Sequence, residues 1–202
     1  IAADGRNSIV RKKAGISVKT HRFGQKALAF AVTHPTPHNN ISTEIHRSGG
    51  PFTFVPLPDH DGKPSSAIVW MENGEKAKNL MEMETKKFER EMTVRSCNIL
   101  GPLRLASKRS LWPIISQIAG RLYSQRLALI GETAHVVPPI GAQGLNMSLA
   151  DIKVLSDLDQ KYPDQLGSID TLKEYQKNRI FDIRQRVTGV SALNQISISK
   201  NR

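Results

Sequence analysis

The sequence predicts a mixed α/β fold in which a mainly antiparallel sheet is inserted into a second domain of α/β type. Alternating apolar residues separated by proline-rich joints, between about residues 20 and 110, are typical of short antiparallel strands and their turns. Near residue 131, a short apolar run leads into a loop rich in glycine and proline and then into a segment with helical periodicity. A chain of 202 residues, 39% of them hydrophobic, can bury a sizeable core in one or two domains.

Strands are expected where apolar and polar residues alternate, because one face of such a strand packs on a core. Leu28, Phe30 and Val32 share one face of the first expected strand, and Phe52 and Phe54 share one face of the second. The expected strands are residues 26–33, 51–57, 66–71 and 103–111, with a short buried strand at 127–131.

Helices are expected where apolar residues recur every three or four positions. Pro163 and Gly167 end the second of these helices, and Ser168 or Asp170 is expected to cap the third. The helices are expected at residues 75–92, from Gly144 to about residue 162, and at residues 171–187, after a turn and a basic segment at 1–19. The second helix places Leu145, Leu149, Ile152 and Leu155 on one face.

The composition is that of a globular protein with a basic surface. A formal net charge of +11 favours nucleic acid, an acidic partner or an anionic membrane surface, or it belongs to a basic surface without such a partner. No apolar run approaches the roughly 18–20 residues that cross a bilayer. The single cysteine, Cys97, cannot form an internal disulfide, which fits a reducing compartment and a cytoplasmic location.

The segment from residue 127 to residue 151 has the features of a ligand-binding loop. Gly131 ends the strand and lets a ligand approach the backbone closely, and Pro138 stiffens the loop that follows. Gly141 and Gly144 keep side chains out of the space beside the helix that begins there. Because the N-terminus of a helix presents free N–H groups and a positive dipole end, the arrangement suits a phosphate or an electron-rich ring.

Two titratable side chains in this segment, Glu132 and His135, each have two possible roles. Glu132 can accept hydrogen bonds from a ribose, or it can pair with a nearby arginine. His135 is expected to be a packed or hydrogen-bonded structural histidine, with a catalytic base as the alternative. Glu132-x-x-His135 imitates a metal motif but lacks the second copy and the helical setting, so no metal site is expected.

A second short motif begins at Asp4. Asp4-Gly5 is a turn signal, and Arg11 can pin this turn through a bidentate bond or face solvent. Taken alone, this motif indicates only a turn.

Together the two motifs resemble the Asp-Gly and Gly-Asp motifs of the flavin-dependent aromatic hydroxylases, the single-component monooxygenases related to p-hydroxybenzoate hydroxylase. Within that superfamily, the chain is most similar to the ubiquinone-biosynthesis hydroxylases over nearly its whole length. The residues that carry the resemblance are Ala3-Asp4-Gly5-Arg6-Asn7-Ser8-Ile9-Val10-Arg11, Gly50-Pro51-Phe-Thr-Phe-Val-Pro56-Leu57, Ser66-Ala-Ile-Val-Trp70, and the run from Leu129 to Asn146, in which Pro139-Ile-Gly-Ala-Gln-Gly-Leu-Asn146 is the most specific string.

The resemblance implies an FAD site with a definite assignment of residues. Asp4, Gly5 and Arg11 would lie near the pyrophosphate and the path of the nicotinamide donor, and Gly131 and Glu132 near the ribityl or ribose hydroxyls. Pro138, Gly141 and Gln143 would wrap the isoalloxazine, and the N–H groups of Gly144, Leu145 and Asn146 would face its N1–C2=O edge. No catalytic side chain is named, since the flavin carries the chemistry.

The same resemblance assigns the parts of the chain. Residues 1–19 and 111–160 would be parts of a Rossmann-like FAD-binding domain, residues 20–110 the sheet that covers the substrate, and residues 161–202 a helical segment. The chain departs from the family in carrying Glu132 where the motif has Asp, and in lacking the Gly-x-Gly-x-x-Gly segment that grips the ADP half of FAD. Since the chain begins with Ile1, we expect a fragment cut at both ends that retains no flavin by itself.

The expected function of the whole protein is hydroxylation of a polyprenylated phenol with NAD(P)H and O₂ in ubiquinone biosynthesis. Peripheral association with the inner membrane or with a biosynthetic complex would bring it to this substrate, and neither nucleic acid nor metal is expected as a partner. The alternatives are another aromatic-substrate flavoprotein hydroxylase, a stand-alone domain without a catalytic role, and a basic nucleic-acid-binding module. The last draws on the net charge and on Gly141-Ala-Gln-Gly144, whose central pair is neutral where a backbone-clamping loop needs basic residues.

Overall fold

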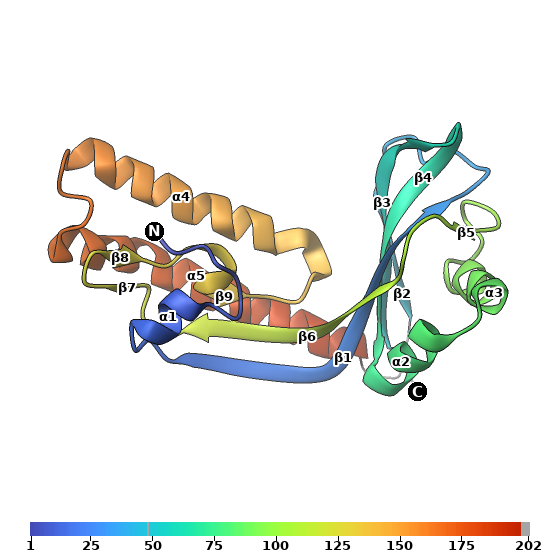
Figure 1. Ribbon diagram of the computed structural model, residues 1–202, viewed down its shortest axis with the longest axis horizontal. Helices are drawn as coiled ribbons and strands as arrows, with labels where there is room; N and C mark the ends of the chain where they lie inside the picture. Colours follow the sequence, from blue (N-terminus) through green and yellow to red (C-terminus); the bar gives the residue numbers. More distant parts are fainter. Residues whose placement is uncertain (48, 199–202) are drawn as a thin grey trace. The chain divides into compact units, whose positions relative to one another are not determined.

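The chain folds into two compact units (Figure 1). The computed structural model describes residues 1–47 and 49–198. One unit comprises Ile1–Arg22 and Ile115–Asn194, and the other comprises Phe23–Ile114 and Gln195–Arg202. In sequence, the main segment of the second unit, Phe23–Ile114, therefore lies between two segments of the first. The predicted mixed α/β fold with an antiparallel sheet and C-terminal helices is confirmed.

Most strands belong to one antiparallel sheet. Within residues 1–47 and 49–198 the strand order is β2-β3-β4-β1-β6-β9, and β5 also pairs with β1. In the register of β1 with β4, Leu28 lies opposite Trp70 and Phe30 opposite Ile68. The strands are β1 (Val18–Thr33), β2 (Thr43–Arg47), β3 (Gly50–His60), β4 (Lys63–Asn73), β5 (Arg104–Leu105), β6 (Ser110–Ala119) and β9 (His135–Val136).

The core of the second unit lies between the sheet and two helices, α2 (Gly74–Glu82) and α3 (Thr85–Arg95). Leu28, Phe30 and Val32 are buried on the predicted face of β1, as are Phe52 and Phe54 of β3. The ring centroids of Phe30 and Phe88 lie 5.1 Å apart, and those of Phe52 and Trp70 lie 5.4 Å apart. Such edge-to-face pairs add to the gain from burying the rings.

The single helix predicted at residues 75–92 is wrong, because the structure has two helices. Met83 takes an extended conformation with φ −64° and ψ 142°, which ends α2. The carboxylate of Glu84 then accepts hydrogen bonds from the N–H groups of Lys86 and Lys87 and so caps α3. A side chain that satisfies the first N–H groups of a new helix competes with continuation of the old one.

The strand predicted at residues 103–111 is also wrong in extent. Only Arg104–Leu105 pairs as β5, and β6 starts at Ser110. The N–H of Leu103 is bound by Thr93 Oγ1, and the N–H of Leu105 by the carboxylate of Glu89. Side chains of α3 therefore take hydrogen-bond donors that a longer strand would have used in its ladder.

The first unit contains α4 (Gln143–Lys161) and most of α5 (Ile169–Ile198), up to Asn194. Helices are confirmed at both predicted places, although α5 runs well beyond residue 187, and Ser168 Oγ accepts a hydrogen bond from the N–H of Thr171 at its start. The predicted strand at 127–131 is reduced to β8 (Leu127–Ala128), which pairs with β7 (Tyr123–Ser124), followed by a parallel bridge between Ala2 and Leu129. The remaining elements are α1 (Ile9–Lys13), η1 (Gly131–Thr133) and η2 (Ile140–Ala142).

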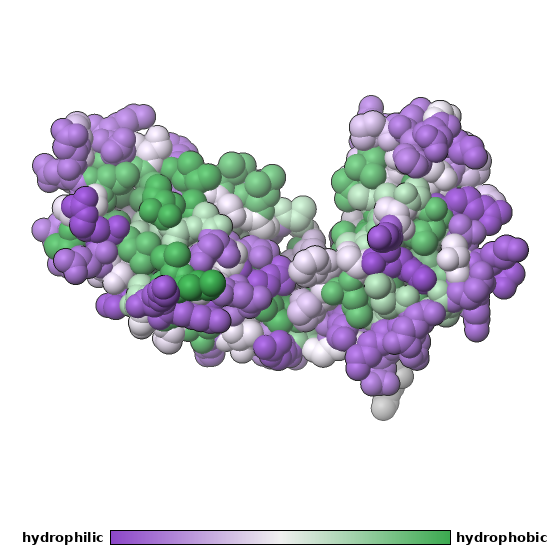
Figure 2. All heavy atoms as spheres, in the orientation of Figure 1, coloured by the Kyte–Doolittle hydropathy of each residue, from purple (hydrophilic) through white to green (hydrophobic). Residues whose placement is uncertain are grey.

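The predicted apolar stripe of α4 does not coincide with its buried face. The buried residues are Met147, Asp151, Leu155 and Leu158. Leu145, Leu149 and Ile152 are instead 70%, 53% and 50% exposed, and Figure 2 shows apolar surface over this helix. The face that packs inward is fixed by a charged residue, Asp151, whose ion pairs are described below.

None of the helices formed by the described residues has both the length and the apolar character needed to span a bilayer.

Candidate functional site

The Asp-Gly turn and the Gly-Glu turn, far apart in sequence, contact each other directly in the first unit. Thr133 Oγ1 accepts a hydrogen bond of 3.0 Å from the N–H of Gly5 and lies 3.2 Å from Asp4 Oδ1. Thr133 is fully buried. Its hydroxyl therefore joins the two turns that sequence analysis assigned to one cofactor site.

Asp4 uses its carboxylate within the protein itself. Oδ1 accepts a hydrogen bond of 2.5 Å from Ser8 Oγ, and Oδ2 accepts hydrogen bonds from the N–H groups of Ile9 (2.9 Å) and Val10 (3.2 Å). The hydrogen bond from Ser8, opposed by some loss of hydration and supported by the backbone N–H groups of Val10 and Ile9, lowers the pKa of Asp4 to about 2. Asp4 thus holds the start of α1 as an ionised carboxylate.

Arg11 pins the turn from inside. It is 3% exposed, and its guanidinium donates to the carbonyl oxygens of Thr133 (2.7 Å) and Arg6 (2.9 Å). The prediction that Arg11 pins the turn is confirmed, with two carbonyl oxygens as acceptors in place of a carboxylate. Burial lowers the pKa of Arg11, while the nearby charge of Asp4 acts in the opposite direction.

Glu132 is paired with an arginine, one of the two alternatives left open by the sequence. Arg6 donates from Nε and Nη2 to the two carboxylate oxygens of Glu132, at 3.0 and 2.9 Å. The side chain of Glu132 is still 51% exposed. A contact of this carboxylate with a ribose stays a prediction.

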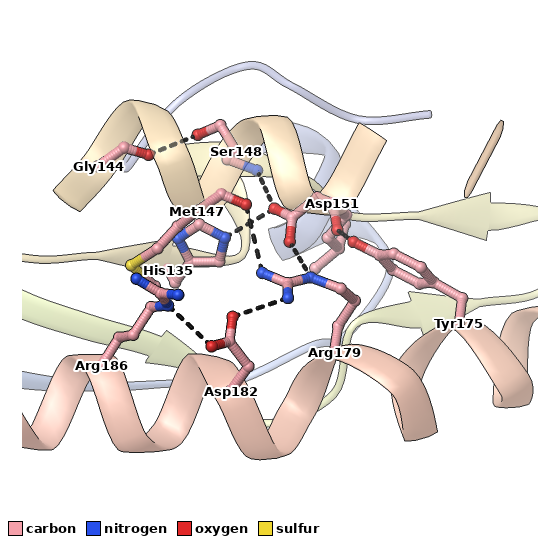
Figure 3. A network of polar contacts seen from close by, with 11 residues as sticks. His135, Gly144, Met147, Ser148, Asp151, Tyr175, Arg179, Asp182 and Arg186 are labelled. Carbon is pink, nitrogen blue, oxygen red and sulfur yellow. Dashed lines mark hydrogen bonds and ion pairs between the residues drawn. The ribbon is translucent and has the colours of Figure 1, made fainter. Parts of the chain in front are cut away.

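A single buried carboxylate, that of Asp151, organises the interior of this unit (Figure 3). Asp151 is 0% exposed and has three partners: the N–H of Gly131 at 2.9 Å, His135 Nε2 at 2.7 Å and Arg179 Nε at 2.8 Å. A buried charge is stable only when it is paired and hydrogen-bonded in this way. His135 is therefore the packed, hydrogen-bonded histidine that the sequence predicted, at 3% exposure.

The ion pairs continue from Asp151 along α5. Arg179 Nη1 donates to Asp182 Oδ2 at 2.8 Å, and Arg186 Nε donates to Asp182 Oδ1 at 2.8 Å. Burial opposes the charge on Arg179, but the hydrogen bonds to Asp151 and Asp182 outweigh it and raise the pKa of Arg179. Burial likewise acts to raise the pKa of Asp182, and the hydrogen bonds from the two arginines outweigh it, so that this pKa is lowered. We call these residues, with His135, the Asp151 network.

Tyr175 anchors the same region through its hydroxyl. It is fully buried and donates a hydrogen bond of 2.8 Å to the carbonyl oxygen of Leu129, two residues before Gly131. Burial, with a smaller contribution from Asp151, raises the pKa of Tyr175, so the hydroxyl remains a donor at physiological pH.

The turn before α4 (residues 138–146, here the α4 turn) has a backbone suited to a close ligand. Gly141 and Ala142 both have left-handed conformations, with φ of +71° and +50°. No side chain caps α4 at Ala142. A Cβ added at Gly141 or Gly144 would meet no atom within 4 Å, so the space beside these two residues is open.

Unlike Gly141 and Gly144, Gly131 has no open space beside it, because a side chain of α4 lies close to its Cα. Its φ is +56°, and an added Cβ would lie 3.2 Å from Ser148 Oγ of α4. The left-handed backbone favours glycine here, and the packing of the turn on α4 leaves little room for a Cβ. A close approach of a ligand to Gly131 stays a prediction.

The residues present fit the isoalloxazine and ribityl part of FAD. The uncapped N-terminus of α4, beside two glycines with open space, offers N–H groups and a positive dipole end to an electron-rich ring edge. The half-exposed carboxylate of Glu132 offers acceptors for hydroxyl groups. The contacts of the eleven predicted site residues with a cofactor stay predictions.

Sequence analysis missed the residues that hold the site together. Thr133, Asp151, Arg179, Asp182 and Arg186 were not singled out. The available signal was that Asp151 lies four residues after Met147 and four before Leu155, on the face of α4 where both of these residues are buried. The arginines of α5 carried no comparable signal, because charged residues are common throughout that helix.

Comparison with known proteins identifies the family. The sequence profile of the FAD binding domain family matches residues 1–188. The chain belongs to this family.

The curated relatives of this chain include enzymes named for ubiquinone hydroxylation. It is 34% identical over 157 residues to ubiquinone hydroxylase UbiL of Rhodospirillum rubrum, a match that covers 78% of this chain and 36% of the relative. It is 28% identical over 188 residues to 3-demethoxyubiquinol 3-hydroxylase of Escherichia coli, covering 90% and 46% of the two chains. The chain thus spans less than half the length of these relatives.

Solved structures show the same fold. The structure of Pseudomonas aeruginosa PqsL in complex with 2-aminobenzoylacetate matches with a TM-score of 0.78 and 22% identity, covering 98% of this chain and 55% of that one. The p-nitrophenol 4-monooxygenase PnpA of Pseudomonas putida matches with a TM-score of 0.71 and 16% identity, covering 98% and 50%. At these identities the likeness concerns the fold alone.

The lowered pKa of Asp4 predicts a pH-dependent contribution to stability. A carboxylate whose pKa falls from 3.8 to about 2 on folding stabilises the fold fully above about pH 4, and this contribution is lost as the pH falls towards 2. We expect Asp4→Asn to lower the free energy of unfolding at pH 5, and the difference from the wild type to shrink between pH 4 and pH 2. Urea titrations followed by far-UV circular dichroism measure both proteins.

Asp159→Asn, at an exposed position on α4, controls for the general effect of removing a carboxylate. A difference between wild type and Asp4→Asn that stays constant from pH 5 to pH 2 would show that Asp4 does not hold α1 as described.

Proposed function

We propose that this chain forms the flavin-ring side of an FAD-dependent monooxygenase that hydroxylates a polyprenylated phenol in ubiquinone biosynthesis. The observation that carries the proposal is the open, uncapped start of α4 between Gly141 and Gly144, in a chain whose relatives are named as ubiquinone hydroxylases. NAD(P)H and O₂ would be the co-substrates. When bound, FAD supplies the redox and oxygen chemistry, which protein side chains do not.

The residues of this chain would bind and orient the cofactor. The N–H groups of Gly144, Leu145 and Asn146 at the start of α4 would stabilise negative charge on the ring edge that faces them, by about 0.3–2 kcal/mol from the helix dipole. Glu132 would accept hydrogen bonds from ribityl or ribose hydroxyls while Arg6 holds its carboxylate in place. Asp4 and Arg11 would act through the backbone, by keeping the Asp-Gly turn against Thr133.

Joining this chain to the rest of a relative tests the proposal. The part of Rhodospirillum rubrum UbiL that lies outside its match with this chain is fused to the chain, and bound FAD is measured by absorbance and by quenching of flavin fluorescence. We expect a yellow protein with FAD in a one-to-one ratio. A fusion that is folded by circular dichroism yet binds no FAD would contradict the proposed function.

A matched pair of variants tests where the ring lies. Gly144→Leu places a side chain in the open space beside α4, at a position without a left-handed backbone. We expect this variant to weaken FAD binding by more than tenfold while the free energy of unfolding changes by less than about 1 kcal/mol. Ser156→Leu, on an exposed position of the same helix, is the control. FAD binding to Gly144→Leu with wild-type affinity would place the ring elsewhere.

We further propose a cytoplasmic protein that binds the inner membrane peripherally, where a polyprenyl chain resides, or binds a biosynthetic complex there. The net charge of +11 and exposed lysines such as Lys12 and Lys13 support attraction to anionic lipid. In a flotation assay at low salt, the chain should float with anionic vesicles and stay behind with neutral ones. Each lysine near the surface contributes about 1 kcal/mol, so replacing both by glutamate should weaken binding at least tenfold.

Absence of flotation with anionic vesicles at low salt would exclude direct binding to lipid.

A further inference from the structure

The Asp151 network extends beyond the interior and reaches the α4 turn. Arg186 Nη1 donates a hydrogen bond of 2.6 Å to Gln143 Oε1, while its Nε donates to Asp182. Gln143 in turn donates from Nε2 to the carbonyl oxygen of Gly141, at 2.9 Å. One unbroken series of hydrogen bonds therefore joins the Gly-Glu turn, through α4 and α5, to the left-handed residues before α4.

We propose that Asp182 and Arg186 are positioning residues for the cofactor, because they hold Gln143 and through it the α4 turn. This inference rests on the proposed function, since it assigns residues of α5 to the same flavin site. Neither residue is proposed to touch the flavin. Their role is to fix the backbone that would.

The conformation of the α4 turn explains why it needs support. Two successive left-handed residues are costly when one of them is not glycine, and Ala142 has φ +50°. The amide of Gln143 offsets this cost by binding the carbonyl oxygen of Gly141. A free glutamine side chain would spend little time in that one rotamer, because ordering a long side chain costs entropy. Arg186 supplies the second contact that selects it.

Arg186 is suited to this task by the shape of its guanidinium. Two different nitrogens bind Asp182 and Gln143, so the side chain spans the two residues as a rigid fork. Asp182 is itself fixed from the other side by Arg179, which is 4% exposed and bound to Asp151. The lowered pKa of Asp182 keeps this carboxylate ionised at physiological pH. The buried ion pair of Asp151 and Arg179 thus fixes the position of Gln143 through Asp182 and Arg186.

Backbone dynamics of the chain itself test the proposal without any flavin. We measure ¹⁵N relaxation order parameters for Gly141, Ala142 and Gly144 in the wild type and in Arg186→Met. The wild-type values should resemble those of a rigid backbone, about 0.85, and the variant should fall towards about 0.6 or below. Arg184→Met, at an exposed position on the same helix, should leave the three values unchanged.

Two further variants separate positioning from general stability. Arg186→Lys keeps the charge but has one nitrogen in place of the fork, so it should behave as Arg186→Met. Gln143→Glu keeps an acceptor for Arg186 but has no donor for Gly141, so the turn should again become mobile. Unchanged order parameters in Arg186→Met, or an equal loss in Arg184→Met, would overturn the proposal, as would full rescue by lysine.

The effect on the cofactor is measured in the FAD-binding fusion. Arg186→Met should weaken FAD binding about fivefold, as expected for loss of a partly exposed charged contact, and should shift the flavin absorption bands. Combined with Gln143→Ala it should add no further loss, because both changes release the same turn. Wild-type FAD affinity in Arg186→Met, or additive losses in the double variant, would also overturn the proposal.

If the wild-type fusion binds no FAD, the proposed function fails, and the relaxation data alone decide whether Arg186 positions the turn.

Discussion

The arrangement of the first unit depends on the buried carboxylate of Asp151. It is fully buried, and its three partners come from the Gly-Glu turn, from β9 and from α5, while Asp151 itself belongs to α4. Removing water from a carboxylate costs several kcal/mol unless charged and hydrogen-bonded partners replace it. The four elements therefore have to meet at one place. This constraint explains why α4 turns Asp151 inward while Leu145, Leu149 and Ile152 stay exposed.

In the candidate site, one set of residues therefore holds the structure together, while other groups are left open to a ligand. Some polar side chains of the site bind only other groups of the protein, and they join two turns that lie more than 120 residues apart in sequence. These residues are Asp4, Arg11, Thr133 and Asp151. The start of α4 is left without a cap, and the carboxylate of Glu132 is half exposed. The exposed groups that a ligand can reach are thus held in place by groups that bind only the protein.

Local patterns predicted much of this fold. Alternation in residues 26–33 and 51–57 identified buried strands, because the period of two directly records which side chains face a core. The break between α2 and α3 was missed, since it depends on Glu84 capping a new helix rather than on periodicity. For the site, the resemblance to the flavin-dependent hydroxylases placed the Asp-Gly and Gly-Glu turns in one cofactor site, which the residues alone did not. It could not show that Arg11 binds carbonyl oxygens or that α5 supplies Arg179, because long-range pairings of charged residues leave no local pattern.

A double-mutant cycle on Asp151 and Arg179 tests this account most directly. Both tryptophans lie in residues 23–114, so the opening free energy is taken from amide hydrogen exchange in α4 and α5 rather than from tryptophan fluorescence. Asp151→Asn and Arg179→Met should each cost about 3–5 kcal/mol, since each removes the oppositely charged partner of a buried charge. The double variant should cost clearly less than the sum of the two. Single costs below about 1 kcal/mol, or costs that simply add, would contradict the central place given to Asp151.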